Sequence, residues 1–215
     1  MSENINTERK DFDEEAAAWD EHPGRVKMAK DVADAISKEI VFTSEMDVMD
    51  FGCGTGLLTL RLQPLVNSIT GIDSSQGMLD VLKTKIARQN LANVRTLYLD
   101  SDKGDVLTGN YHLIVSNMTL HHIKEIRPLL DQFYRITAPS GYLCIADLDP
   151  DDGKFHDSNE GVFHFGFERE ALRRDFIAAG FEDVRHVTAA EVIKPGSDGV
   201  SRRFTVFLMI GRKHS

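Results

Sequence analysis

The stretch that decides the fold is VMDFGCGTG, which runs from Val48 to Gly56 and joins an apolar run to three glycines at alternate positions. An acidic residue closes the apolar run. Glycines at this spacing let the backbone turn sharply and approach a ligand closely. Residues 57–62 are predicted to form a helix whose N-terminus faces the same point. The pattern therefore predicts a nucleotide site built from a strand, a loop and a helix.

The glycine spacing discriminates between two classes of nucleotide site. A dinucleotide-binding loop has the spacing G-x-G-x-x-G, whereas Leu57 stands where its third glycine would belong. A nicotinamide-dependent oxidoreductase is therefore disfavoured. The segment resembles motif I of the class I S-adenosylmethionine (SAM)-dependent methyltransferases, a strand that ends in D/E-x-G-x-G-x-G, with Asp50, Gly52, Gly54 and Gly56 as its elements. The resemblance implies SAM as the cofactor and methyl transfer as the reaction.

Length and composition bound the architecture. The chain has 215 residues, of which 41% are hydrophobic, and no Pro/Gly/Ser-rich stretch divides it. We expect a single domain over residues 1–215. The resemblance implies that it is a methyltransferase domain with an N-terminal helical lid at 1–40 and a Rossmann-like core at 41–215. No apolar run approaches the roughly 20 residues that span a bilayer, and the first residues lack the apolar core of a signal peptide. We expect a cytoplasmic protein without membrane insertion.

Charge and cysteine content exclude other classes. The formal net charge of −9 repels phosphate backbones, so we expect no nucleic acid partner. Cys53 lies in the glycine loop and Cys144 in an apolar strand. These different settings argue against a disulfide framework or a metal cluster.

Strand and helix patterns alternate along the chain. Strands are expected at the apolar run before Gly52 and at 68–73, 94–100, 111–117, 142–148, 184–192 and 204–210. Helices are expected at 57–62, after Ser74 or Ser75, at 123–136 and at 169–179. This order predicts an α/β fold with a doubly wound, mostly parallel sheet. The resemblance implies seven strands in the order 3-2-1-4-5-7-6, with the last strand antiparallel.

Two helical segments are expected before the first strand. Phe12, Ala16 and Trp19 share one face, and a second apolar stripe runs over residues 25–40. The stretch F-D-x-x-A-x-x-W-D from Phe12 to Asp20 resembles the opening of small-molecule methyltransferases of the ubiquinone-biosynthesis and type 11 kind. That resemblance implies a lid over cofactor and acceptor, and it assigns Trp19 to the cofactor site.

Acidic residues close the first two strands. Asp73 falls about twenty residues after the glycine loop, where a carboxylate can accept hydrogen bonds from both ribose hydroxyls. A solvated turn aspartate is the alternative. We assign Asp50 to the methionine end of the cofactor, either through water or by orienting the loop, and a helix-capping role is compatible with this.

The resemblance assigns further cofactor contacts. It implies that Asp100 and Ser101 face the adenine ring, with Asp102 as a rival acid, and a solvated charge run stays an alternative. Met78 corresponds to an apolar residue under the adenine, although a core role is open. Ser74 follows Asp73 at the same edge of the sheet. Asn117, which ends the fourth strand, would offer its carbonyl and side chain to the methionine moiety.

Histidines are the candidates for catalysis. Methyl transfer from a sulfonium is an in-line displacement that depends on alignment, and it needs a base when the acceptor carries a proton. His121 and His122 follow the fourth strand, where the family often has a similar L-H-H. His156 and His164 lie in the long loop 149–166. We take His121, His122 and His164 as catalytic candidates, with a structural role open for each.

The acceptor is predicted to be a small organic molecule that is methylated at oxygen, nitrogen or carbon. No proline follows Asn117, which excludes the N/D-P-P-Y/F route to methylated bases, and Cys144 lacks the setting of a cytosine-methylating nucleophile. We assign no metal, because the calcium-like run that begins at Asp147 has its glycine one place late. A weak cation site at Asp149, His156 and His164 stays open, as does a non-catalytic SAM- or nucleotide-binding regulatory module. The oligomeric state is open.

Overall fold

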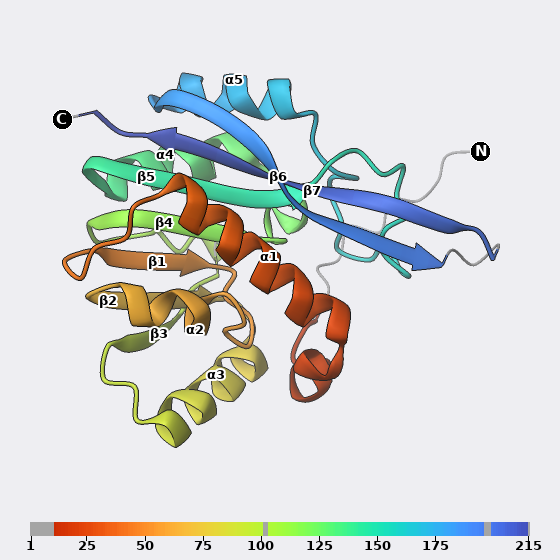
Figure 1. Cartoon of the computed structure of the whole chain (residues 1–215), viewed down its shortest axis with the longest axis horizontal. Coiled ribbons are helices and arrows are strands. Elements are labelled where there is room, and N and C mark those ends of the chain that lie inside the picture. The colour runs from red at the N-terminus through yellow and green to blue at the C-terminus, as the bar shows by residue number, and fades with distance from the viewer. Residues whose placement is uncertain (1–10, 101–102, 196–198, 215) are drawn as a thin grey trace.

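The computed structural model describes residues 11–100, 103–195 and 199–214, and its centre is a seven-stranded sheet in the order β3-β2-β1-β4-β5-β7-β6 (Figure 1). The strands are β1 (Asp47–Phe51), β2 (Ser68–Asp73), β3 (Val94–Tyr98), β4 (Tyr111–Asn117), β5 (Thr137–Leu148), β6 (Glu182–Pro195) and β7 (Ser201–Arg212). Strands β1 to β5 pair in parallel, whereas β7 is antiparallel to both β5 and β6. The predicted strand order and the antiparallel hairpin are confirmed.

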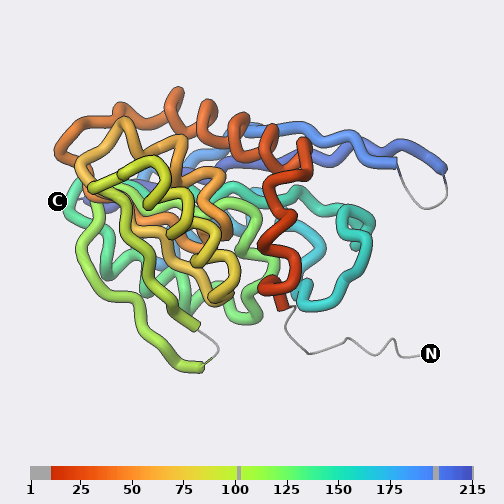
Figure 2. Tube along the Cα trace, turned by 90° about the horizontal axis from the view of Figure 1, so that it is seen from below, coloured from red at the N-terminus to blue at the C-terminus, as the bar shows by residue number. Residues whose placement is uncertain are grey.

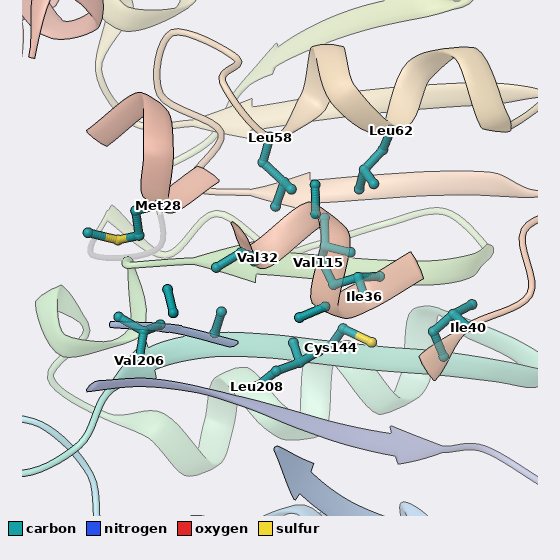
Figure 3. Packing of buried hydrophobic residues seen from close by; sticks show 14 of the residues in the cluster. Met28, Val32, Ile36, Ile40, Leu58, Leu62, Val115, Cys144, Val206 and Leu208 are labelled. Carbon is teal, nitrogen blue, oxygen red and sulfur yellow. The ribbon is translucent and has the colours of Figure 1, made fainter. Parts of the chain in front are cut away.

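Helices cover both faces of this sheet. They are α1 (Pro23–Glu39), α2 (Thr59–Leu62), α3 (Gln76–Gln89), α4 (Ile126–Ile136) and α5 (Arg169–Ala179), with short 3-10 helices η1 (Ala16–Glu21), η2 (Gln63–Leu65) and η4 (Leu120–His122). The apolar stripe of α1 packs with α2 on one face of the strands (Figure 3). The apolar faces of α4 and α5 are buried on the other face. Two apolar layers therefore hold the carboxyl ends of the parallel strands at one edge.

Some element boundaries differ from those predicted. Strands β2 and β4 have the predicted bounds, but β5 begins at Thr137 rather than at Tyr142, because Thr137 already pairs with Tyr111 before the register shifts. The hairpin strands β6 and β7 are longer than predicted and project beyond the rest of the sheet (Figure 1). Helix α2 begins only at Thr59, because the turns of the glycine loop continue as far as that residue.

The N-terminal segment is less helical than predicted. Residues 13–15 form a turn, and only the 3-10 helix η1 follows before α1. The cause is tertiary: the Asp13 carboxylate accepts hydrogen bonds from the Ser75 hydroxyl and from the Gly77 amide at the start of α3. Figure 2 shows this segment, in red, descending from the start of α1 beside α3. It therefore lies at the edge of the sheet where the strands end.

None of the helices in the described part of the chain combines the length and the apolar character that a bilayer crossing requires.

Candidate functional site

The glycine loop has the backbone conformation that its sequence predicts. Gly52, Gly54 and Gly56 have φ angles of 71°, 53° and 85°, which L side chains rarely adopt. A Cβ atom on Gly52 would lie 2.2 Å from the Thr119 hydroxyl oxygen, so the loop packs directly against the segment that follows β4. A Cβ on Gly54 would meet only the Met78 sulfur, at 3.9 Å. The middle glycine therefore faces open space, which a close-fitting ligand can use.

Asp73 ties this loop to the next helix. One of its carboxylate oxygens accepts a hydrogen bond from the Gly54 amide at 2.7 Å, and the other accepts one from the Ser75 amide at 2.9 Å. An ionised carboxylate offers about four acceptor positions. These two backbone bonds are thus compatible with the predicted role toward ribose hydroxyls, and they place the carboxylate beside the glycine loop.

Asp50 is buried at the end of β1, with 1% of its surface exposed. The Thr59 hydroxyl donates a 2.6 Å hydrogen bond to its carboxylate. Burial raises the pKa of Asp50 to about 7, the Thr59 hydrogen bond opposes that rise, and the nearby charge of Asp73 adds to it. Asp50 thus holds the start of α2, which agrees with the helix-capping role, and its role toward the methionine end of the cofactor stays a prediction. Thr59 was not predicted, since a threonine after a glycine loop is no signal by itself.

A pH-dependent stability follows from this burial. Between about pH 4 and pH 7, folded Asp50 keeps a proton that the unfolded chain releases, so unfolding becomes easier as the pH rises through this window. We expect Asp50→Asn to remove this fall in the free energy of unfolding, which is at most about 4 kcal/mol at about 1.4 kcal/mol per pKa unit. Urea denaturation across the window measures it. The exposed Asp152→Asn is the control, and parallel curves for wild type and Asp50→Asn would contradict the assignment.

A cavity of about 210 Å³ opens beside the ends of β2 and β3. It is lined by Asp11, Phe12, Asp13, Ser74, Ser75, Tyr98, Asp100 and Lys103. Asp100 is buried, and the Lys103 ammonium lies 3.4 Å from its carboxylate. Asp100 and Ser74 thus line the same cavity, and their contacts with the cofactor stay predictions. Ser101 and the rival Asp102 lie outside the described residues.

Met78 and Trp19 do not line this cavity. The Met78 side chain is buried beneath the glycine loop, and its amide donates a hydrogen bond to the Ser75 hydroxyl, which caps α3. The Trp19 ring packs on the Arg25 guanidinium at 3.6 Å and on the edge of Phe12. Trp19 therefore supports Phe12, which does line the cavity, and a contact of Trp19 with the cofactor stays a prediction.

Asn117 ends β4 next to the glycine loop. Its side-chain oxygen is buried and has no hydrogen-bond partner within the part of the chain that the structure describes. The Thr119 hydroxyl donates to the main-chain oxygens of Asn117 and Gly52, at 3.2 and 3.4 Å. Because a buried carbonyl oxygen without a partner is costly, this position suits a ligand that carries N–H donors.

The N-terminal segment is fastened across the same edge at two points. Asp13 accepts from Ser75 and Gly77, as described above. Asp20 accepts from the Thr55 hydroxyl at 2.5 Å and forms an ion pair with Lys85. Asp13, Asp20 and Thr55 were not predicted as site residues. The signal was present, because both aspartates belong to the F-D-x-x-A-x-x-W-D stretch and Thr55 lies inside motif I.

Two of the three candidate histidines, His121 and His122, cluster with His156 on the acceptor side. The His121 ring centroid lies 4.2 Å from that of His122 and 4.9 Å from that of His156. Nδ1 of His121 lies 2.7 Å from the Asp147 carboxylate. Burial and the neighbouring His121 lower the pKa of His122 to about 3 and that of His156 to about 4. His122 and His156 are therefore neutral imidazoles near pH 7.

His164 has a different environment. Its Nε2 donates a 2.9 Å hydrogen bond to the Ile123 carbonyl, which fastens the loop after β5 to the segment after β4. This favours the structural alternative for His164. A cation site at Asp149, His156 and His164 was also considered. The Asp149 carboxylate already accepts hydrogen bonds from Arg169 and from the Thr205 hydroxyl. Within residues 11–100, 103–195 and 199–214, no three His, Cys, Asp or Glu side chains are arranged to hold a metal ion.

Comparisons with known proteins agree with this geometry. A family model described as a methyltransferase domain matches residues 22–186. An uncharacterised methyltransferase of Schizosaccharomyces pombe is 32% identical over 120 residues, which are 53% of this chain and 42% of that protein. The malonyl-[acyl-carrier protein] O-methyltransferase of Calditerrivibrio nitroreducens is 28% identical over 176 residues, 78% of this chain and 64% of that protein. The chain spans about half the length of the curated relatives it matches.

A solved structure has the same fold. Phosphoethanolamine N-methyltransferase 2 of Haemonchus contortus, in complex with S-adenosyl-L-methionine, superposes with a TM-score of 0.70 over 96% of this chain and 60% of that chain. The sequence identity is 14%, so this likeness concerns the fold alone.

Proposed function

The chain belongs to the class I SAM-dependent methyltransferases, and from this premise we propose that it transfers a methyl group to a small organic acceptor. The observation that carries the proposal is the buried, unpartnered side-chain oxygen of Asn117 beside the glycine loop. Bound SAM supplies an electrophilic methyl group on a sulfonium. The ammonium at its methionine end carries the N–H donors that the Asn117 oxygen needs.

The other residues at this edge fit the remaining parts of SAM. Asp73 would accept hydrogen bonds from the ribose hydroxyls, and Asp100 would face the adenine in the cavity beside β3. Asp50 holds the start of α2 and would support the methionine end through the glycine loop. The open space at Gly54 allows the loop backbone to approach the cofactor closely. The acidic and amide oxygens at this edge would thus suit the cationic groups and the hydroxyl donors of SAM.

The acceptor side supports an enzyme rather than a regulatory module. The cluster of His121, His122 and His156 lies directly after β4, and a module that only senses SAM needs no such groups. One relative is named as an O-methyltransferase of malonyl-[acyl-carrier protein], and one protein of the same fold as a phosphoethanolamine N-methyltransferase, so oxygen and nitrogen acceptors both stay open. A small acceptor also agrees with the net charge of −9, which disfavours nucleic acid. The more specific likeness to the ubiquinone-biosynthesis and type 11 enzymes stays a prediction.

We propose a single domain over residues 1–215, and of the lid expected at 1–40 we propose that the described residues 11–22 act as the lid, because α1 packs in the core. The hydrogen bonds of Asp13 and Asp20 support this role, because they fasten the segment to the start of α3 and to the glycine loop. Phe12 extends the lid toward the acceptor side, where its ring lies 5.2 Å from that of His122.

Incubation with methyl-labelled SAM and a metabolite extract tests the function. Transfer of label to an extract component, identified by mass spectrometry, is the expected result. Saturable SAM binding without any labelled product would favour the regulatory module. Absence of SAM binding up to millimolar concentration would contradict both functions.

The ribose assignment makes a separate prediction. Asp73→Ala removes a charge-assisted acceptor for the ribose hydroxyls, and we expect SAM binding to weaken by about 2 kcal/mol, or roughly thirtyfold in Kd. Calorimetry measures it. The matched control is Asp47→Ala, because the Asp47 carboxylate accepts hydrogen bonds from Asn67 and Ser68 at the opposite edge of the sheet. Equal SAM affinities of folded Asp73→Ala and wild type would show that Asp73 does not hold the ribose.

A further inference from the structure

Two buried imidazole nitrogens on the acceptor side lack hydrogen-bond partners. They are Nε2 of His121 and Nε2 of His156, and neither has a partner among the residues that the structure describes. The two rings pack on each other with centroids 4.9 Å apart. Leaving a buried polar atom unpaired costs free energy, so both nitrogens are suited to a molecule that supplies the missing hydrogen bonds.

The environment of His121 determines which of its nitrogens carries the proton. Asp147 lies near the end of β5 and is fully buried, and its carboxylate also accepts hydrogen bonds from the main-chain amides of His121 and Leu148. Burial raises the pKa of Asp147, but the charge of His121 and these hydrogen bonds outweigh it, so the pKa lies below its usual value. An ionised carboxylate only accepts, so Nδ1 of His121 donates to it.

We propose that His121 is the general base of the methyl transfer, that Asp147 is its positioning residue, and that Nε2 of His156 accepts a second hydrogen bond from the acceptor. In the neutral form of His121 the proton on Nδ1 faces Asp147, so Nε2 presents a bare lone pair. The methyl acceptor is therefore an alcohol, phenol or amine whose reacting oxygen or nitrogen carries a proton. This inference rests on the proposed function.

The step balances without another reactant. The acceptor's lone pair forms the bond to the methyl carbon as the carbon–sulfur bond breaks with its electron pair kept by sulfur, and the acceptor proton passes to Nε2 of His121. The imidazolium that forms is stabilised by Asp147, in the manner of a carboxylate–histidine pair. His122 and His156 are neutral, so neither opposes the new positive charge.

Access to this nitrogen requires a local movement. His121 is 1% exposed, and the His156 ring that packs on it belongs to the loop after β5. The acceptor must therefore displace the His156 ring from its place on His121. This gives His156 a role in acceptor binding that is separable from the proton transfer.

Nuclear magnetic resonance of the ligand-free protein, labelled with ¹⁵N in histidine, tests the tautomer without any turnover. We expect neutral His121 to carry its proton on Nδ1 in the wild type. In Asp147→Asn, the new amide can donate to Nδ1, and we expect the proton to move to Nε2. A wild-type His121 that carries its proton on Nε2 would overturn the proposal, and this result needs no variant that must fold.

Kinetics with the acceptor found by SAM labelling supply the second test. His121→Asn retains an amide that can bond Asp147 but removes the base, and we expect kcat to fall by about 10²- to 10⁴-fold while the Kd for SAM stays within about threefold. We expect Asp147→Asn to lower kcat similarly, and His156→Ala to raise the acceptor KM about tenfold with little change in kcat. His186→Asn, on the surface of β6, is the matched control.

The outcomes separate this inference from the proposed function. Normal kcat in folded His121→Asn, or a methylated atom that carries no proton before the reaction, would overturn the inference and leave the methyltransferase function intact. Absence of SAM binding in the wild type would contradict the proposed function instead.

Discussion

We expect Gly54→Ala to fold almost as stably as the wild type and to bind SAM at least about 100-fold more weakly. The added methyl group meets only the Met78 sulfur at 3.9 Å, so the fold has room for it. The φ angle of 53° costs on the order of 1 kcal/mol for a residue with a side chain. The methyl group fills the space through which the loop backbone would approach the ligand. Calorimetry with SAM and thermal unfolding measure the two effects.

Substitutions at two other glycines separate the cost of the backbone conformation from steric exclusion of the ligand. Gly199 has a φ angle of 76° with open space around it, so Gly199→Ala tests the cost of the backbone conformation alone, and we expect unchanged SAM binding. In Gly52→Ala the new methyl group collides with Thr119, so both stability and binding should fall. Wild-type SAM affinity in Gly54→Ala would show that the ligand does not approach the middle of the loop.

Local patterns predicted those parts of the fold that local sequence determines. Strands β2 and β4 have the predicted bounds because apolar runs end there in Asp73 and Asn117. Helix α5 also has its predicted bounds, since Gly180 ends it in a left-handed conformation at a φ of 111°. The order of the strands came from the resemblance to a known family, and the alternation of strand and helix predicted only a mostly parallel sheet.

Contacts between distant residues account for what sequence patterns missed. The pairing of His121 with Asp147 joins the segment after β4 to the end of β5, and no periodicity relates positions 26 residues apart. The hydrogen bonds of Asp13 to the start of α3 likewise replace the helix that the Phe12, Ala16 and Trp19 spacing predicts. Burial also sets the protonation of Asp50. From the sequence a strand-end aspartate is expected to be charged, but burial in the fold raises the pKa of Asp50 to about 7.

The hydrogen bonds that hold the N-terminal segment predict a large loss of activity when this segment is removed. We expect a variant that begins at His22 to fold cooperatively and to lose at least about 100-fold in kcat/KM for the acceptor. Ala16 is the only buried residue in the range 11–22, and the apolar layer of α1 starts at Met28, so the core remains. Loss of Phe12 would open the cavity beside β3 and the face of His122 to water, which weakens alignment of the reactants.

A double variant shows whether the hydrogen bonds of Asp13 and Asp20 are needed for closure of the N-terminal segment. Asp13→Ala with Asp20→Ala removes the hydrogen bonds to Ser75, Gly77 and Thr55 without shortening the chain. The matched control is Asp31→Ala with Asp34→Ala, because those carboxylates pair with lysines on the exposed face of α1. We expect only the first pair to abolish the change in Trp19 fluorescence on SAM addition, because Trp19 is the sole tryptophan and reports closure of this segment. If the shortened chain kept full activity and the fluorescence of the wild type did not respond to SAM, residues 11–21 would be a structural extension of α1 with no part in methyl transfer.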